Sequence, residues 1–157
     1  MDKFDGLTFS DGDIFESDCE ALVNPVNVSP GYMGALAGVF SRKFPGLEVN
    51  YLAAVERGET GVGKLIPFRP TNSDVEWIIN FPTTPTMGAA SNLEFIITGL
   101  ESLTDFCDLE QVKSIAIPAL GCGVGGLDWE EVKFRIKFWY GNSNFLFLNK
   151  VVIFNPK

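Results

Sequence analysis

The sequence IPALGCGVGGLDWEE, residues 117–131, connects an apolar run to a helix signal through a loop with four glycines in six positions. The run, KSIAIPAL (113–120), is typical of a strand that is buried on both faces of a sheet. Two interpretations of the bare loop compete: a ligand comes close to its backbone, or the turn is simply tight. In the first case, N–H groups that precede a helix favour a phosphate as the ligand.

Strands and helices alternate along the rest of the chain. Apolar and amphipathic patterns predict strands at 7–10, 20–24, 63–68, 75–81 and 150–155, and helices at 33–44, 47–58, 91–106 and from 128 onward. Capping patterns support two of these helices, through Ser91 with Glu94 and through Asp128 with Glu131. The alternation predicts a three-layer α/β/α domain around a mixed, largely parallel sheet. Ligands of such sheets sit beyond the carboxyl ends of the strands, where the glycine loop falls.

Length and composition indicate a single domain over residues 1–157, because 46% of the residues are hydrophobic and 14 of them are Phe. The chain shows no signal peptide and no apolar run long enough to span a bilayer. We therefore expect a cytoplasmic protein without membrane contact, and we also expect a monomer. The three cysteines are odd in number and far apart, which excludes a disulfide framework and a thiolate zinc site.

The chain contains no histidine, which excludes Ser-His-Asp triads, Cys-His pairs and the common zinc sites. We expect neither a metal nor a cofactor, so any chemistry must use carboxylates, lysines, backbone dipoles or the substrate itself. The net charge of −8 argues against nonspecific nucleic-acid binding, which depends on neutralisation of phosphates by Lys and Arg. It leaves room for one small nucleotide that is held by backbone amides.

The glycine loop matches two well-known phosphate loops poorly. GCGVGG (121–126) satisfies G-x-G-x-x-G, but a dinucleotide fold needs an acidic residue at the end of the next strand. That strand ends in Phe154 and Asn155 instead. No Gly-Lys-Ser/Thr follows the loop, so a P-loop NTPase is also excluded.

Six motifs occur in an order that resembles the macro domain family. They are GDI (12–14), ALVNPVN (21–27), GYMG (31–34), INFPT (79–83), IPALGCGVGGLDWEEV (117–132) and VVIF (151–154). The resemblance covers nearly the whole chain and is strongest to the branch that contains the DarG antitoxins and the terminal ADP-ribose protein glycohydrolase. It implies a domain that binds ADP-ribose, or an ADP-ribosylated protein or DNA.

The resemblance also implies which loops hold the diphosphate. The amides of the glycine loop would wrap it, through Gly121, Cys122, Gly123, Val124, Gly125 and Gly126. The segment GYMGALA (31–37) would flank the diphosphate and the distal ribose, through Gly31, Met33 and Gly34. The alternatives are a structural turn for the first loop and an ordinary helix start for the second.

The resemblance also implies which residues contact the adenine and the distal ribose at the two ends of ADP-ribose. Asp13 would accept a hydrogen bond from the adenine amino group, with Ile14 beside it, and Phe154 would stack on the base with Asn155 as a polar contact. Asn24 and Asn27 would approach the distal ribose, since amides both donate to and accept from hydroxyls. Turn chemistry explains Asp13 and the asparagines equally well, and Phe154 is also interpretable as a plain core residue.

The chain departs from the resemblance at the catalytic position. Relatives carry a catalytic lysine where this chain has Thr84, and an aspartate in the glycine loop of some relatives is replaced by Gly125. Ala35 and Leu36 also replace the relatives' MGKG pattern. A threonine supplies neither a Schiff base nor a cation, so the lysine route is closed. What remains is a water that Asn27 positions, with the loop amides stabilising developing charge.

Three functions follow as alternatives. The first is an enzyme that removes ADP-ribose from a macromolecule, or hydrolyses ADP-ribose 1″-phosphate, without a lysine. The second is a module that binds or sequesters ADP-ribose or a related NAD-derived nucleotide without turnover. The third is a structural domain with an occluded loop. Without a histidine to activate it, Cys122 is interpreted as a packing residue, and Lys64 as a solvated one. A short acidic domain of this kind suits a bacterial or phage protein that counters ADP-ribosylation-based defence.

Overall fold

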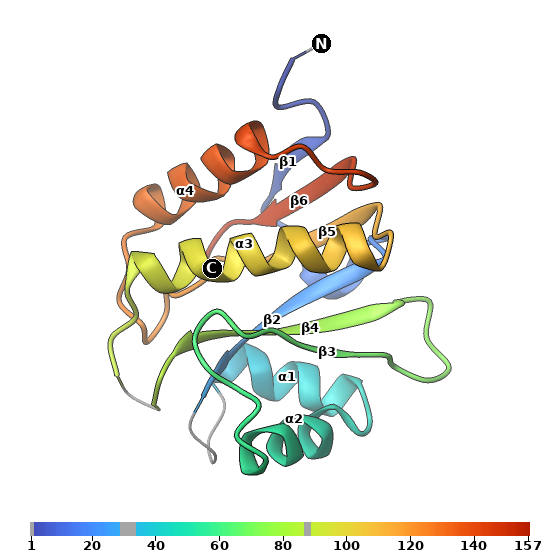
Figure 1. The fold of residues 1–157 in the computed structure, drawn as a ribbon, viewed down its shortest axis with the longest axis vertical. Helices are drawn as coiled ribbons and strands as arrows, with labels where there is room; N and C mark the ends of the chain where they lie inside the picture. Colours follow the sequence, from blue (N-terminus) through green and yellow to red (C-terminus); the bar gives the residue numbers. More distant parts are fainter. Residues whose placement is uncertain (1, 29–33, 87–88) are drawn as a thin grey trace.

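The computed structural model describes residues 2–28, 34–86 and 89–157. A six-stranded sheet forms its centre, with helices on both faces (Figure 1). The strands are β1 (Leu7–Ser10), β2 (Ala21–Asn27), β3 (Ile66–Phe68), β4 (Trp77–Thr84), β5 (Ser114–Ile117) and β6 (Lys150–Phe154). The helices are the 3-10 turn η1 (Ile14–Glu16), α1 (Ala35–Lys43), α2 (Leu47–Glu56), α3 (Leu93–Leu109) and α4 (Trp129–Asn142).

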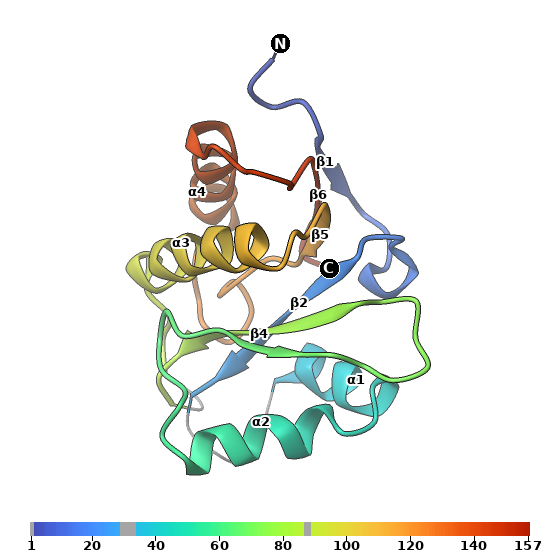
Figure 2. The same cartoon turned by 45° about the vertical axis from the view of Figure 1, so that its right-hand side comes forward.

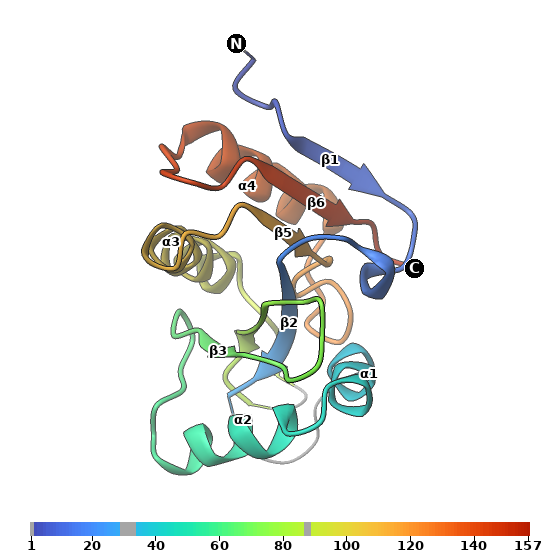
Figure 3. The ribbon, with the colours of Figure 1, turned by 90° about the vertical axis from the view of Figure 1, so that its right-hand side faces the viewer.

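The strands lie in the order β1-β6-β5-β2-β4-β3. All neighbours pair in parallel except β3, which is antiparallel to β4. Figure 3 shows the arrowheads of β1, β6 and β5 pointing the same way, with the C-terminus beside them. The carboxyl ends of five strands therefore meet at one edge of the sheet, which is where α/β sheets bind ligands.

Strand residues alternate between two apolar layers. On β2, Val23 packs in the cluster of α3 and α4, and Leu22 packs in the cluster of η1 and α1. On β5, Ile115 packs in the first of these clusters and Ala116 packs in the second. Figure 2 shows α3 and α4 on one side of the sheet and α1 and α2 on the other. Burial on both faces explains the continuous apolar runs, and the predicted three-layer fold is confirmed.

Two predicted helix caps are wrong in detail. Asn92 is the N-cap of α3, because its side chain accepts from the Glu94 N–H at 2.8 Å. Ser91 bonds elsewhere, since its hydroxyl donates to the Thr83 carbonyl at 2.6 Å. Asp128 is the N-cap of α4, but its side chain makes no capping bond. Within the described ranges, no helix is long and apolar enough to cross a membrane.

Candidate functional site

A cavity of about 630 Å³ lies over the carboxyl ends of the parallel strands. Ligand pockets typically enclose roughly 300–1,000 Å³, so it has the size of a small-molecule site. The cavity brings together eleven of the residues that the sequence singled out: Asp13, Ile14, Asn27, Gly34, Gly121, Cys122, Gly123, Val124, Gly125, Phe154 and Asn155. Ala35, Leu36 and Ala37 of the predicted segment 31–37 also line it. Its wall further contains residues that the sequence reasoning did not assign to a ligand, namely Phe15, Pro25, Val39, Thr83, Thr84, Ala89, Pro118, Ala119, Pro156 and Lys157.

Two of the predicted site residues that the structure describes, Asn24 and Gly126, are not part of this wall. Asn24 is fully buried, and its amide donates to the Asn80 side chain at 2.9 Å. Asn80 in turn donates to the Ile66 carbonyl at 3.0 Å, so the two amides connect β2, β4 and β3 inside the fold. Gly126 lies outside the wall, and Gly31 and Met33 lie outside the described residues.

Three of the loop glycines are explained by the fold. A Cβ on Gly125 would lie 2.7 Å from the Gly121 carbonyl oxygen, and a Cβ on Gly121 would lie 2.7 Å from the Leu127 side chain. Gly121 and Gly126 also have positive φ angles of 73° and 77°, which other residues rarely adopt. Gly123 differs, because its φ is ordinary and a Cβ there would meet nothing within 4 Å. The fold does not require a glycine at position 123, which lines the cavity.

The glycine loop contains backbone N–H groups with and without acceptors in the protein. Cys122, Gly126 and Leu127 donate their N–H groups to carbonyls within the turn. In the part of the chain that the structure describes, the N–H groups of Gly123, Val124 and Gly125 donate to no protein acceptor. Backbone N–H groups require a partner, and successive N–H groups of this kind form anion-binding concavities. These three N–H groups therefore form a candidate anion site in the middle of the cavity.

At one end of the cavity lie Asp13, Ile14, Phe154, Asn155 and Lys157, which we call the Asp13 end. Asp13 caps η1, because its carboxylate accepts from the Phe15 N–H at 2.9 Å. Phe154 is 8% exposed and packs in the same apolar cluster as Ile14. The Asn155 side chain donates to Asp11 at 2.8 Å and its N–H donates to the Ser10 carbonyl at 2.9 Å. These bonds tie the segment after β6 to the turn after β1.

At the other end lie Asn27, Thr83 and Thr84, where β2 and β4 terminate; we call this the Asn27 end. The register shifts here, because Val26 is opposite Pro82 whereas Asn27 is opposite Thr84. The irregularity brings both threonines to the cavity wall, as β-bulges next to sites commonly do. The Thr84 hydroxyl donates to Asn27 Oδ1 at 2.5 Å, and the Tyr51 hydroxyl donates to the Asn27 carbonyl. Asn27 is thus fixed through both its side chain and its backbone.

Cys122 is not a nucleophile at neutral pH. Burial, with a smaller contribution from the nearby Asp128 carboxylate, raises the pKa of its thiol to about 11. The thiol is also a donor to the Leu120 carbonyl at 3.5 Å. Because the thiolate is the reactive form, the site offers no sulfur chemistry near pH 7.

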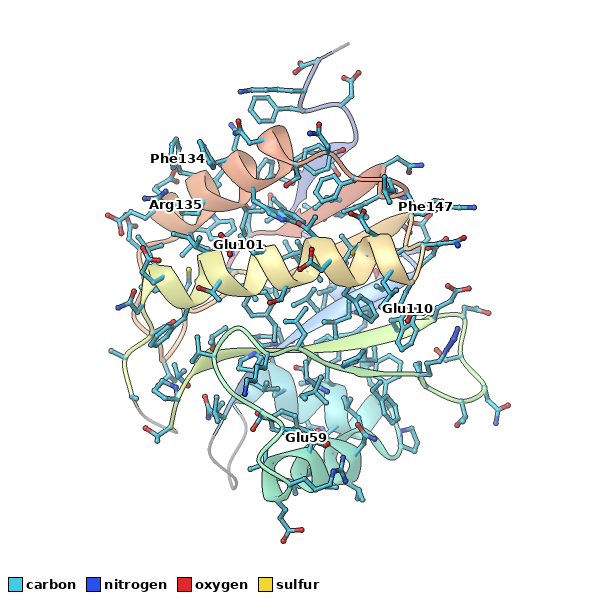
Figure 4. The ribbon with its side chains drawn as sticks, viewed as in Figure 1. Glu59, Glu101, Glu110, Phe134, Arg135 and Phe147 are labelled. Atoms are coloured by element: carbon cyan, nitrogen blue, oxygen red, sulfur yellow. The ribbon has the colours of Figure 1, made fainter. Side chains whose placement is uncertain are left out.

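A second, smaller hollow of about 270 Å³ lies where α3 begins beside α4. Leu93, Glu130, Glu131, Phe134 and Arg135 line it. Figure 4 shows Phe134 and Arg135 on the outward side of α4. Phe134 is 60% exposed, and the hollow mixes charges of both signs without a buried polar group.

Comparison with known proteins supports the family that the motifs indicated. The family model of the Macro domain matches residues 23–136. The chain belongs to the macro domain family. A DNA ADP-ribosyl glycohydrolase of Mycobacterium tuberculosis is 40% identical to this macro domain over 132 residues, which are 83% of this chain and 37% of the relative. This macro domain therefore spans little more than a third of the length of the DNA ADP-ribosyl glycohydrolases it matches.

Solved structures of macro domains also resemble this chain. The macrodomain of Mycobacterium tuberculosis DarG has a TM-score of 0.89 at 36% identity, over 96% of this chain and 98% of that one. Thermosipho africanus DarTG, solved in complex with ADP-ribose, has a TM-score of 0.87 at 28% identity, over 96% of this chain and 42% of that one. The predicted likeness to the DarG branch is confirmed.

Proposed function

We propose that this macro domain binds ADP-ribose in the main cavity. The observation that carries the proposal is the row of three N–H groups at Gly123, Val124 and Gly125, which belong to residues of the cavity wall and have no protein acceptors in the described ranges. A diphosphate supplies acceptors for all three, and the N-terminus of α4 directly after the loop favours a negative charge. The ADP-ribose complex of the related Thermosipho DarTG supports the choice of ligand.

The ligand would lie along the strand ends. Adenine would occupy the Asp13 end, between Ile14 and Phe154, with Asp13 accepting from its amino group. The carboxylate has a second oxygen for this bond, because only Oδ1 serves the Phe15 N–H. The distal ribose would reach the Asn27 end, where amide and hydroxyl groups of the wall are the kind of group that pairs with sugar hydroxyls.

We further propose that this macro domain removes ADP-ribose from DNA, since the relatives of about 40% identity are DNA ADP-ribosyl glycohydrolases. Water would attack C1″ as the glycosidic bond breaks, and the departing group would take up the proton. Asn27 would position that water, and the loop amides would stabilise the diphosphate as charge develops. A monomer in the cytoplasm of a bacterium or of a phage-infected cell is the proposed setting.

A second function is favoured by Thr84. Thr84 is 4% exposed and its hydroxyl donates to Asn27, so it supplies neither an amine nor a charge to the reaction. A macro domain with this end would hold ADP-ribose and release it unchanged. Binding is common to both functions, and turnover alone separates them.

Titration calorimetry with ADP-ribose tests the binding, with AMP and GDP-ribose as controls. Product analysis of the same samples with ADP-ribosylated DNA and ADP-ribosylated protein tests the turnover. Binding with release of ADP-ribose from DNA would establish the glycohydrolase, and binding without any release would establish the sequestering module. Absence of ADP-ribose binding by the folded protein would overturn both.

A further inference from the structure

The wall of the cavity contains few charges, and they are unevenly placed. Asp13 and Lys157 are the charged side chains among the described lining residues, and both belong to the Asp13 end. The described segments that contribute the wall near the Asn27 end are 21–28, 34–41, 77–86, 89–93 and 114–127, and they contain no Lys, Arg, Asp or Glu. No cation of these segments can accompany a ligand group at the Asn27 end.

The polar groups at this end already have partners. The Thr84 hydroxyl donates to Asn27 Oδ1 at 2.5 Å, and the Thr84 carbonyl accepts from the Val28 N–H at 3.0 Å. Thr83 and Thr84 are 7% and 4% exposed, so water has little access to either. This end is therefore a neutral and poorly hydrated environment, which suits hydroxyl groups better than ions.

A phosphate on C1″ would meet two penalties here. It carries a charge of about −1.5 to −2 near pH 7, and burial of such a charge without a cation is costly. The diphosphate of the same ligand would occupy the three free N–H groups of the glycine loop and would repel a further anion nearby. An uncharged group on C1″ would meet neither penalty.

We infer that the Asn27 end selects ADP-ribose ligands by charge at C1″. It accepts a hydroxyl or an uncharged glycosidic substituent and rejects a phosphate, and Thr84 is the residue that sets this preference. The inference rests on the proposed ADP-ribose binding, and it applies whether the bound ligand is released or hydrolysed. It removes ADP-ribose 1″-phosphate from the candidate substrates.

Calorimetry on the unmodified protein gives the first test, with ADP-ribose and ADP-ribose 1″-phosphate at pH 7.5 and pH 5.5. The 1″-phosphate should bind at least about tenfold more weakly at pH 7.5. The difference between the two dissociation constants should be smaller at pH 5.5. The second pKa of a phosphate monoester is about 6, so the 1″-phosphate carries less negative charge at that pH. Equal or tighter binding of the 1″-phosphate at pH 7.5 would overturn the inference and leave the proposed function intact. Failure of ADP-ribose itself to bind would overturn the proposed function and this inference with it.

Two variants test whether Thr84 sets the preference for an uncharged group at C1″. Thr84→Lys places an ammonium beside Asn27, and the ratio of the two dissociation constants should move toward the 1″-phosphate by at least about tenfold. Thr84→Met is the matched control, since it adds a side chain of similar length without charge and should leave the phosphate disfavoured. An unchanged ratio in a folded Thr84→Lys variant would overturn the role of Thr84. Where the lysine variant does not fold, the comparison of the two pH values decides.

Discussion

The two ends of the cavity are built from different chemistry. The Asp13 end contains a carboxylate, an aromatic ring and the Asn155–Asp11 bond, all placed by turns that follow β1 and β6. The Asn27 end contains amide and hydroxyl groups that the irregular pairing of β2 with β4 brings to the wall. Because of this difference, the Asp13 end is suited to bind a nucleotide base selectively, and the Asn27 end is suited to bind an uncharged sugar. Backbone donors of the glycine loop lie between them.

Gly123→Glu should cause the largest loss, because it introduces a carboxylate beside the three free N–H groups. Like charges in contact cost several kcal/mol, so ADP-ribose and ADP should both lose on the order of 3 kcal/mol or more, measured by calorimetry. Gly123→Ala is the control, since its Cβ would meet no atom within 4 Å. Unchanged affinity in folded Gly123→Glu would contradict the anion site.

Asp13→Ala should weaken every adenine ligand, AMP included, by roughly 1–3 kcal/mol, because a buried donor on the base loses its acceptor. The preference for ADP-ribose over GDP-ribose should disappear in the same titrations. Asp2→Ala is the matched control, since Asp2 also accepts from the N–H two residues later, at 3.0 Å, but lies outside the cavity wall. Equal effects of the two substitutions would make Asp13 a turn residue only.

Thr84→Val should affect the other end by a smaller amount. It keeps the shape of the side chain but removes the hydroxyl that donates to Asn27 Oδ1, which should weaken ADP-ribose by about 1 kcal/mol. AMP lacks the distal ribose, so its affinity should not change. A parallel loss for AMP would show that the substitution disturbs the whole cavity rather than the Asn27 end.

Cys122→Ser should have the smallest effect, with ADP-ribose affinity close to that of the unmodified protein. Because the pKa of the thiol is raised to about 11, little thiolate exists at pH 8, and alkylation by iodoacetamide should be slow there. The rate should increase with pH until it approaches that value. Mass spectrometry of the modified protein measures this, and rapid alkylation of Cys122 at pH 7 would contradict the raised pKa.

Much of the fold is readable from the sequence because both local pattern and burial agree. The apolar runs around Ile115 and Val151 could only be central strands, and the glycines after Leu120 mark the loop that follows one of them. The order of the six motifs along the chain also predicts the macro domain family. Helix caps were less predictable, since Ser91 and Asn92 are equally good capping residues and the Thr83 carbonyl decides between them.

Parts of the site escape sequence reasoning because they depend on distant partners. Asn24 and Asn27 look alike in NPVN, yet Asn24 pairs with Asn80 inside the sheet and Asn27 reaches the cavity. The distinction arises from the register with β4, which no local pattern contains. Lys157 joins the wall only because β6 returns to the centre of the sheet, beside β1.

The position of Pro156 and Lys157 on the cavity wall has a practical consequence for handling this protein. A peptide fused after Lys157 would leave from the rim of the cavity, whereas residues 2–6 lie outside the wall. An affinity tag therefore belongs at the N-terminus, where it leaves the ligand path open. A fluorophore attached at the other end would be a reporter, since its emission would respond to the arrival of a nucleotide beside it.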